Sequence, residues 1–277
     1  MQALLRWRRA FADRSLRGKP HGVTLVAIAR NEGRHLVEWL AHHLAVGFDR
    51  IVLYDNESTD DTRSLFKALS PRDLRLRRVP WPTPPDASAQ ILAYAHALTD
   101  LATPWVMYLD PNEFVVPLGH ASMADLIATL PDAVASLHVN RRRFGASRRE
   151  GSADALVTRA FTRSAPYAAE AHYQFRTLAR ADRIAAIRSQ DVLCRHGRRI
   201  LSDGLIFTDT SETSADRVTF DSVQINHYPN RLLDDASARS PEHEGTENHA
   251  IRAFDTAFEA EYRRLCAILG WEPALSG

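Results

Sequence analysis

Three groups of polar residues follow hydrophobic segments in the first half of the chain, and each has the residue types of a ligand site. One polar group after a strand means little, because turns favour Asp and Asn. Three in succession predict a shared site, because a carboxylate at the end of a buried strand needs a cation or hydrogen-bond donors. The groups are Arg30-Asn31-Glu32, Asp55-Asn56 with the residues up to Asp60, and Asp110-Pro111-Asn112-Glu113.

The third group has the spacing of a metal site. Asp110 and Asn112 are two residues apart, and in extended backbone that spacing places both side chains on one side of the chain. Oxygen ligands presented together suit a hard divalent cation that also bridges phosphate oxygens. A turn with Asp110 as its cap explains the same residues equally well, so the sequence leaves both interpretations open.

The segments that must position these groups alternate between strand and helix patterns. The run VTLVAIA at 23–29 is continuously apolar, as in a strand covered on both faces. The alternation predicts an α/β fold, a doubly wound and mostly parallel sheet that binds ligands beyond the carboxyl ends of its strands. We expect strands over 23–29, 50–54, 74–79 and 105–109, and helices over 33–46, 60–69 (capped by Ser58 or Thr59) and 87–101.

After about residue 121 the pattern loosens. We expect a helix over 122–130, a strand over 133–139, irregular strands and loops over 141–219, a strand ending at 224–228, and helices over 232–238 and 248–269. With no clear linker, the predicted organisation is a basic N-terminal segment (1–21), one domain (22–240) and a C-terminal helical segment (241–277) packed on that domain.

Composition limits the function classes. The chain has 277 residues, of which 45% are hydrophobic, and 35 Lys and Arg against 34 Asp and Glu give a net charge of +1, so nucleic acid is not an expected partner. Cys194 and Cys266 form no CxxC pair, which suits a reducing cytoplasm. No stretch reaches the roughly 18 apolar residues of a membrane span.

The N-terminal segment is strongly basic. Residues 1–22 carry six positive charges and one negative charge, and Leu4, Leu5, Trp7 and Phe11 are its larger apolar residues. A solvated first helix is the favoured interpretation, and an amphipathic helix resting on the inner face of a membrane through residues 1–20 is the alternative.

Several motifs occur in the order and spacing of one known family. The chain is similar to the family 2-like glycosyltransferases, and specifically to the branch related to glycosyltransferase family 92, over residues 22–240. The motifs are Ala29 to Glu32, Glu38-Trp39 with His42-His43, Tyr54 to Thr62, Gln90 with Ala93-Tyr94, Leu109 to Phe114, Phe144 to Ser147, and Ile225-Asn226-His227-Tyr228.

This resemblance implies a GT-A fold that uses a nucleotide-activated sugar and a divalent metal. It assigns the metal to Asp110, Asn112 and His227, a mixed oxygen and imidazole set that suits Mn²⁺ better than Mg²⁺. The resemblance assigns nucleotide binding to Arg30, Asn31, Glu32, Asp55, Asn56 and Gln90. Without the resemblance, the simpler interpretation of His227 is a hydrogen-bonded core or surface histidine. The simpler interpretation of Asp55 is an N-terminal cap of the following helix, and both roles of Asp55 are compatible.

Sugar transfer with inversion also requires a carboxylate base. Glu170 and Asp203 lie in the irregular half and are the candidates, with a solvated surface position as the simpler alternative for each. Arg176 and the run 141–143 have the donors to bind a diphosphate or an anionic acceptor, although a run of arginines is more typical of a solvated face.

Three features depart from the family pattern. Asn112 replaces the second acidic residue of Asp-x-Asp, Ala95 replaces an Asn, and the Lys-Ser that follows the C-terminal His-Tyr in the family becomes Arg231-Leu232 or is absent. The predicted function is metal-dependent transfer of a sugar, with a UDP-sugar as favoured donor and a glycan as acceptor. The alternatives are a catalytically weak nucleotide-sugar binding module and a metal-dependent phosphohydrolase.

Overall fold

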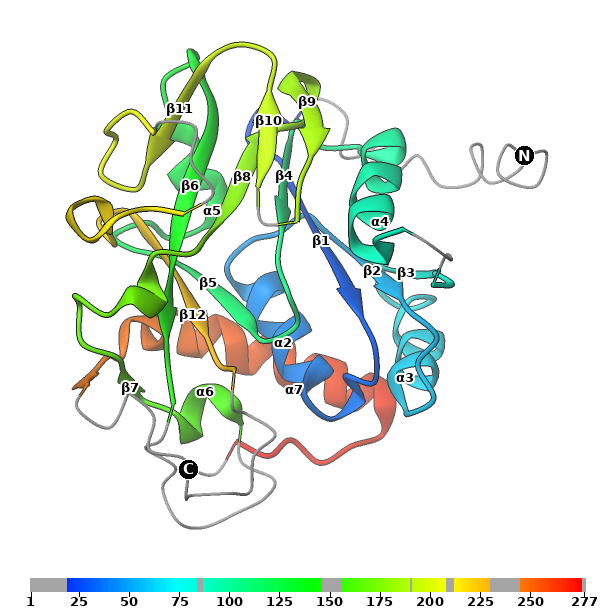
Figure 1. Ribbon diagram of the computed structural model, residues 1–277. Helices are drawn as coiled ribbons and strands as arrows, with labels where there is room; N and C mark the ends of the chain where they lie inside the picture. The colour runs from blue at the N-terminus through cyan, green and yellow to red at the C-terminus, as the bar shows by residue number, and fades with distance from the viewer. Residues whose placement is uncertain are drawn as a thin grey trace.

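The computed structural model describes residues 19–83, 87–145, 156–189, 191–207, 212–229 and 245–275. Its centre is a nine-stranded sheet with helices on both faces (Figure 1). The strands of this sheet are β1 (Val23–Ala29), β2 (Arg50–Asp55), β3 (Leu76–Pro80), β4 (Trp105–Tyr108), β5 (Glu113–Pro117), β6 (Val134–Arg143), β8 (Phe175–Arg180), β11 (Arg198–Leu201) and β12 (Val223–His227).

The remaining elements surround this sheet. The helices are α2 (Gly33–Ala45), α3 (Thr62–Leu69), α4 (Ala89–Ala97), α5 (Met123–Ala128), α6 (Val157–Ala160) and α7 (Asp255–Leu269). Two small antiparallel pairs are formed by β9 (Ile184–Ile187) with β10 (Val192–Cys194) and by β7 (Arg163–Ser164) with β13 (Thr246–Glu247). Short 3₁₀ turns cover 98–100, 170–172, 181–183, 215–217 and 250–254.

The first four strands form a parallel sheet in the order β3-β2-β1-β4. The register pairs Ala29 with Asp55 and Val26 with Tyr108, so the carboxyl ends of β1, β2 and β4 lie at one edge. The predicted doubly wound, mostly parallel α/β sheet is therefore confirmed. Chain order reverses between β1 and β4, which is where such sheets form their ligand crevice.

Beyond β4 the sheet changes direction. β8 runs antiparallel to both β4 and β6, and β12 lies between β6 and β5. This arrangement brings the amino end of β8 to the edge where β1, β2 and β4 end. A residue early in β8, such as Arg176, is thus near residues that follow the parallel strands.

Alternate residues of each strand point to opposite faces, and both faces are covered. Leu25 of β1 and Met107 of β4 pack in the core formed with α2, α3, α5 and α7. Val26 and Val106 pack on the other face, against α4 and the β9–β10 pair. Because neither face is open to water, these strands read as continuous apolar runs.

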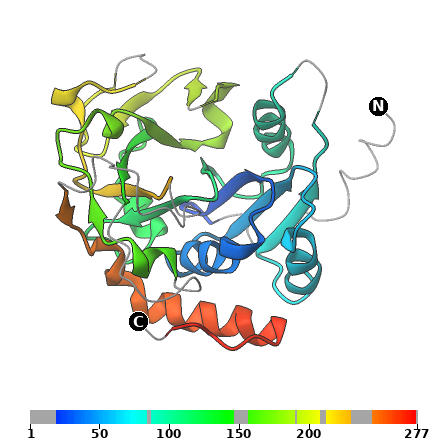
Figure 2. The same ribbon diagram turned by 60° about the horizontal axis from the view of Figure 1, so that its bottom comes forward.

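Helix α7 lies outside α2 and packs against α2 and α3 (Figure 2). Leu265 and Cys266 of α7 have almost no exposed surface and belong to the same core as β1. The C-terminal helix therefore shares the hydrophobic core of the parallel sheet.

Several sequence expectations need correction. β5 at Glu113–Pro117 was not predicted, and residues 175–180 form the central strand β8, within a stretch expected to be irregular. The expected cap of α3 at Ser58 or Thr59 is wrong. Instead, Asp60 accepts hydrogen bonds from Thr62 N at 3.0 Å and from Gly33 N of α2 at 2.8 Å. Residues 1–18 and the expected helix at 232–238 lie outside the described residues.

Candidate active site

The loops after β1 and β2 are joined by hydrogen bonds. Asn31 has a positive φ of 58°; its backbone N–H donates to Ser58 Oγ at 3.0 Å, and its side-chain oxygen accepts from Thr59 N at 2.8 Å. Arg30 and Asn31 are exposed, and Glu32 is half-buried. The Asn31 side chain is therefore used to hold the two loops together, beside the expected nucleotide pocket.

Asp55 ends β2 with a buried side chain. Arg78 of β3 binds its Oδ2 through Nε at 2.6 Å and Nη2 at 2.5 Å, and Ser58 N donates to Oδ1 at 3.0 Å. The interpretation of Asp55 as the N-terminal cap of the following helix is wrong, because α3 begins at Thr62 and the Asp55 carboxylate instead closes the turn at Ser58. Asn56 donates to Trp81 O and Thr83 Oγ1, each at 3.0 Å. Sequence reasoning missed Arg78, because its pairing with Asp55 depends on the β2–β3 register.

Residues 110–113 form a turn after β4. Glu113 N donates to Asp110 O at 3.0 Å, and Asp110 N donates to Glu113 Oε2 at 2.8 Å. The expectation of extended backbone here is wrong, because β4 ends at Tyr108. The turn interpretation holds, but it is the Glu113 carboxylate that caps the turn and leaves the Asp110 carboxylate for other contacts.

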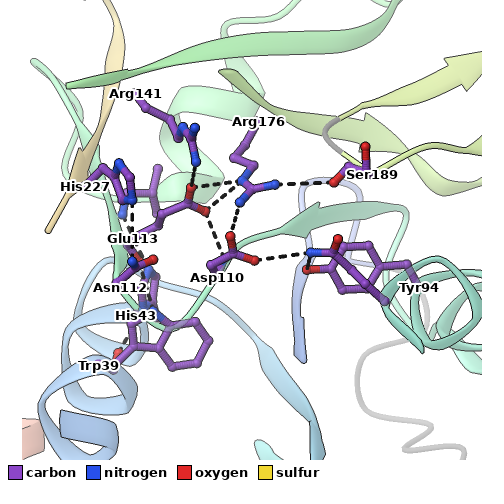
Figure 3. A network of polar contacts seen from close by, with 12 residues as sticks. Trp39, His43, Tyr94, Asp110, Asn112, Glu113, Arg141, Arg176, Ser189 and His227 are labelled. Carbon is purple, nitrogen blue, oxygen red and sulfur yellow. Dashed lines mark hydrogen bonds and ion pairs between the residues drawn. The ribbon is translucent and has the colours of Figure 1, made fainter. Parts of the chain in front are cut away.

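Two carboxylates and two guanidinium groups meet at this turn, and we call Asp110, Glu113, Arg141 and Arg176 the charge cluster (Figure 3). Arg141 Nη1 lies 2.8 Å from Glu113 Oε1, and Arg176 Nε lies 2.7 Å from Glu113 Oε2. A second nitrogen of Arg176, Nη2, forms an ion pair with Asp110 Oδ2.

Burial and neighbouring charges shift the pKa values of the two carboxylates in opposite directions. Burial alone would raise the pKa of Glu113, but the guanidinium groups of Arg176 and Arg141 hold it at about 2. The pKa of Asp110 is raised, by burial first and by the Glu113 charge second, although Arg176 opposes both. About a third of the Asp110 side chain is exposed, whereas that of Glu113 is not exposed at all. Asp110 is thus the carboxylate of the charge cluster that a ligand can reach.

Gln90 of α4 also reaches Asp110. Its Nε2 lies 3.3 Å from Asp110 Oδ1 and 3.3 Å from the Tyr94 hydroxyl. The motif residues of α4 therefore meet the turn after β4, as a shared site requires.

His227 lies beside Asn112, with Asn112 Nδ2 3.4 Å from His227 Nε2. β12 places His227 opposite Glu113 of β5 and Arg143 of β6. Burial first, and nearby guanidinium groups second, lower the pKa of His227 to about 4 despite the Glu113 charge. The imidazole is therefore neutral at pH 7, as a metal ligand must be.

The donor set fits a divalent cation in part. Among the residues that the structure describes, Asn112 Oδ1 is buried without a hydrogen-bond partner, and His227 is neutral, so two uncharged donors are adjacent. Asp110 is turned toward Arg176, away from Asn112 (Figure 3). Over the described ranges, no three His, Cys, Asp or Glu residues gather as a metal site.

Glu170 and Asp203, the candidate bases, are both exposed. Asp203 Oδ1 accepts a hydrogen bond from Leu205 N at 2.9 Å and so caps a turn. Within the part of the chain that the structure describes, neither carboxylate contacts Asp110, Asn112 or His227.

The expectation that the run 141–143 is a solvated face is wrong. Arg141 is buried on Glu113, and Arg142 lies over the Phe220 ring at 5.1 Å. Arg176, which has the donors to bind an anion, lies in the sheet between the two carboxylates of the charge cluster and pairs with both.

The Glu38-Trp39 and His42-His43 motif of α2 has a structural use. Trp39 Nε1 donates to Glu113 O at 2.9 Å, His42 Nε2 to Val115 O at 2.8 Å, and Val115 N lies 3.4 Å from His43 Nε2. β5 is an edge strand, so these side chains bond the backbone groups that no neighbouring strand reaches. α2 thereby fixes the strand that carries Glu113.

Among the described residues, the structure has no helix with the length and apolar character needed to cross a membrane. The basic segment expected to rest on a membrane lies almost entirely outside them.

Comparison with known proteins matches residues 28–176 to the model of glycosyltransferase family 92. A family 92 protein of Ricinus communis is 33% identical over 139 residues, 48% of this chain and 24% of that protein. One of Oryza sativa subsp. japonica is 25% identical over 150 residues, 53% of this chain and 25% of that protein. The matched segments thus span about a quarter of the curated relatives.

Solved structures are more distant. A mannosyltransferase of Pyrobaculum calidifontis in complex with GDP-Man and Mn²⁺ is 16% identical over 51% of this chain and 42% of its own, with a TM-score of 0.35. The glucosyl-3-phosphoglycerate synthase of Mycobacterium tuberculosis, solved with Mn²⁺, UDP and phosphoglyceric acid, is 14% identical over 61% and 60%, with a TM-score of 0.34. The family model covers more than half of the chain, including the end of β1, all of β2 and β4, and the charge cluster, and on that ground the chain belongs to glycosyltransferase family 92.

Proposed function

We propose that this chain transfers a sugar from a nucleoside-diphosphate sugar to a hydroxyl group of a glycan or another acceptor, with a UDP-sugar as the favoured donor. The observation that carries the proposal is Asp110, a partly exposed carboxylate at the edge where β1, β2 and β4 end. That edge lies within the segment that matches family 92.

Transfer leaves negative charge on the departing diphosphate, and a site must stabilise it. A divalent cation, Mn²⁺ in the favoured case, supplies positive charge to the diphosphate when bound. Asp110, Asn112 Oδ1 and His227 Nε2 would hold it, since these are one anionic and two neutral donors, two in the turn after β4 and one at the end of the adjacent strand β12. Gln90 orients Asp110 through its 3.3 Å contact.

Inversion at the sugar is part of the proposal, and it requires a carboxylate that accepts the acceptor proton. Glu170 and Asp203 remain the candidates from the sequence. A cytoplasmic location is also proposed, as suits the unpaired cysteines.

Calorimetry with UDP and GDP, each with Mn²⁺, tests the site. We expect Asp110→Ala to weaken nucleotide binding at least tenfold, or about 1.4 kcal/mol, with the fold retained. Asp132→Ala is the matched control, since that side chain is fully exposed and pairs with Arg180, away from Asp110. An unchanged dissociation constant for Asp110→Ala would count against the proposed function.

A second function is a nucleotide-sugar binding module with weak catalysis. It is favoured by Asn112, because the turn at 110–113 has one negative charge fewer than the Asp-x-Asp pattern of the family. Donor hydrolysis and transfer assays on the wild-type chain separate the two. Binding without turnover, for a panel of donors and acceptors, would support the module.

A further inference from the structure

Arg176 is a cationic side chain that already binds Asp110. Its Nη2 pairs with Asp110 Oδ2, its Nε lies 3.0 and 2.7 Å from the two Glu113 oxygens, and its Nη1 donates to Ser189 O at 3.4 Å. The other Asp110 oxygen accepts from Gln90 at 3.3 Å. Both oxygens of the accessible carboxylate therefore already have donors, and a metal at Asp110 must either displace one of these donors or share an oxygen with it.

The guanidinium is a fixed part of the sheet. Arg176 belongs to β8, pairs in register with Val139 of β6, and is 2% exposed. An arginine guanidinium stays charged in proteins, and although burial alone would lower the pKa of Arg176, the Glu113 and Asp110 carboxylates raise it. The partly exposed Asp110 side chain can therefore be released without any change in β8.

The charges of the cluster balance. Asp110 and Glu113 carry two negative charges, Arg141 and Arg176 carry two positive ones, and Asn112 adds none. A divalent cation arriving alone meets a neutral group with one reachable carboxylate that is already paired. Carboxylates are the ligands that attract such cations most strongly, and here the attraction is largely cancelled. A diphosphate would bring the missing negative charge.

We propose that Arg176 is a built-in counter-cation of Asp110, which competes with the divalent metal for this carboxylate and attracts the donor diphosphate. The consequence is an order of binding: the protein takes up the metal together with the nucleotide and hardly at all without it. The inference rests on the proposed function, because it concerns the donor site.

The test measures metal and nucleotide binding separately. Mn²⁺ binding is followed by the loss of the electron paramagnetic resonance signal of the aqueous ion, and UDP binding by calorimetry with and without Mn²⁺. For the wild-type chain we expect Mn²⁺ uptake in the presence of UDP and little uptake without it. Tight binding of Mn²⁺ alone to the wild-type chain would overturn the inference without any variant.

Arg176→Gln separates competition from a structural role, because the two predict different signs. Competition predicts that Mn²⁺ alone binds roughly tenfold tighter, as expected for loss of a charge-assisted hydrogen bond, while UDP binds more weakly. A merely structural role predicts that both affinities fall, and that result, or an unchanged Mn²⁺ affinity in a folded variant, would refute the proposal.

Arg180→Gln is the matched control. It is another arginine of β8, stacked on Trp105 and paired with exposed Asp132, and its loss should change neither affinity. Asn112→Asp changes the charge balance without touching Arg176, because it adds a negative charge in place of the amide whose Nδ2 lies 3.4 Å from His227 Nε2. It should tighten the binding of Mn²⁺ alone, and if it does not, charge does not limit metal binding.

Failure of the inference differs from failure of the proposed function. If the wild-type chain binds neither UDP nor GDP, with or without Mn²⁺, the proposed function is wrong. If it binds nucleotide but Mn²⁺ binding is independent of nucleotide, only the role of Arg176 is wrong.

Discussion

Glu113 is a carboxylate with no exposed surface, and the Arg141 and Arg176 guanidinium groups both bind it. Two buried cations depend on this one side chain and on the smaller contribution of Asp110. Its carboxylate also accepts the Asp110 N–H and so closes the turn that presents Asp110. The residue therefore stabilises the fold and shapes the site at once.

Glu113→Gln should destabilise the protein by about 3 kcal/mol or more, because removing one member of a buried charge group leaves its partners uncompensated. The free energy of unfolding from urea titrations measures the effect. Asp132→Asn, which removes an exposed partner of Arg180, should change it by less than about 1 kcal/mol. Equal effects of the two variants would show that burial of Glu113 is not a source of stability.

Protonation of His42 should make the free energy of unfolding depend on pH, and the sign of this dependence follows from the pKa of His42. Burial lowers its pKa to about 4 from 6.5, so as pH falls the unfolded chain takes up a proton before the folded chain does. Stability is then highest above pH 6.5 and falls between pH 6.5 and 4, by about 3 kcal/mol for this group when fully developed. His43 acts in the same direction.

Urea midpoints measured from pH 7.5 to 4.5 test this dependence. His42→Gln keeps a donor near Val115 O but cannot titrate, so its midpoint should fall less steeply with decreasing pH. A slope identical to that of the wild-type chain would place the acid sensitivity elsewhere.

At the scale of elements, one side chain in the loop after β2 accepts hydrogen bonds from the first residues of two helices. Asp60 binds Gly33 N at the start of α2 and Thr62 N at the start of α3. These contacts lower its pKa, although burial opposes them. The carboxylate thus couples the two helices that pack on one face of the parallel sheet.

Asp60→Ala should reduce the free energy of unfolding by about 2 kcal/mol, which is roughly 1 kcal/mol for each lost cap. Asp61→Ala is the matched control one residue away, because that exposed side chain makes no capping hydrogen bond. If the Asp61 variant were the more destabilised of the two, the assignment of the cap would be wrong.

The sequence predicted the elements whose pattern is local and missed those whose pattern depends on distant partners. The strand at Val23–Ala29 was predicted with its observed bounds, because burial on both faces makes it apolar throughout. β8 was missed because it contains Arg176 and Arg180, which are tolerated in a central strand only through Glu113, Asp110 and Trp105.

The same distinction holds for the site. The motifs brought together Asp110, Asn112 and His227, and the structure places them around one turn and its neighbouring strand. The pairing of Asp110 with Arg176 was not predictable, since the residues are 66 positions apart in the chain and meet only through the antiparallel β4–β8 pair.

At the scale of the molecule, a substitution in α7 tests whether the chain unfolds as one unit. Leu265 of α7 is fully buried in the core of the parallel sheet. Leu265→Ala should therefore lower the stability of the whole sheet by about 2–5 kcal/mol, in a single transition.

Fluorescence from the buried Trp39 and Trp105 and far-ultraviolet circular dichroism should report the same urea midpoint for this variant. Leu74→Ala, at a residue that is three-quarters exposed, serves as the control and should change little. Two separate midpoints would show that α7 and the 241–277 segment form an independent unit.

The antiparallel pairing of β8 with β4 has a consequence for chimeras between members of this family. The amino-terminal half of the chain contributes Asp110 and Glu113, and the half beginning with β6 contributes both of their counter-charges. A swap of either half with a relative therefore exchanges one side of a salt bridge, and hybrids should survive only where both parents keep an arginine or lysine opposite the same acid. Recombination across this boundary is thus constrained by four side chains, however freely the outer loops are exchanged.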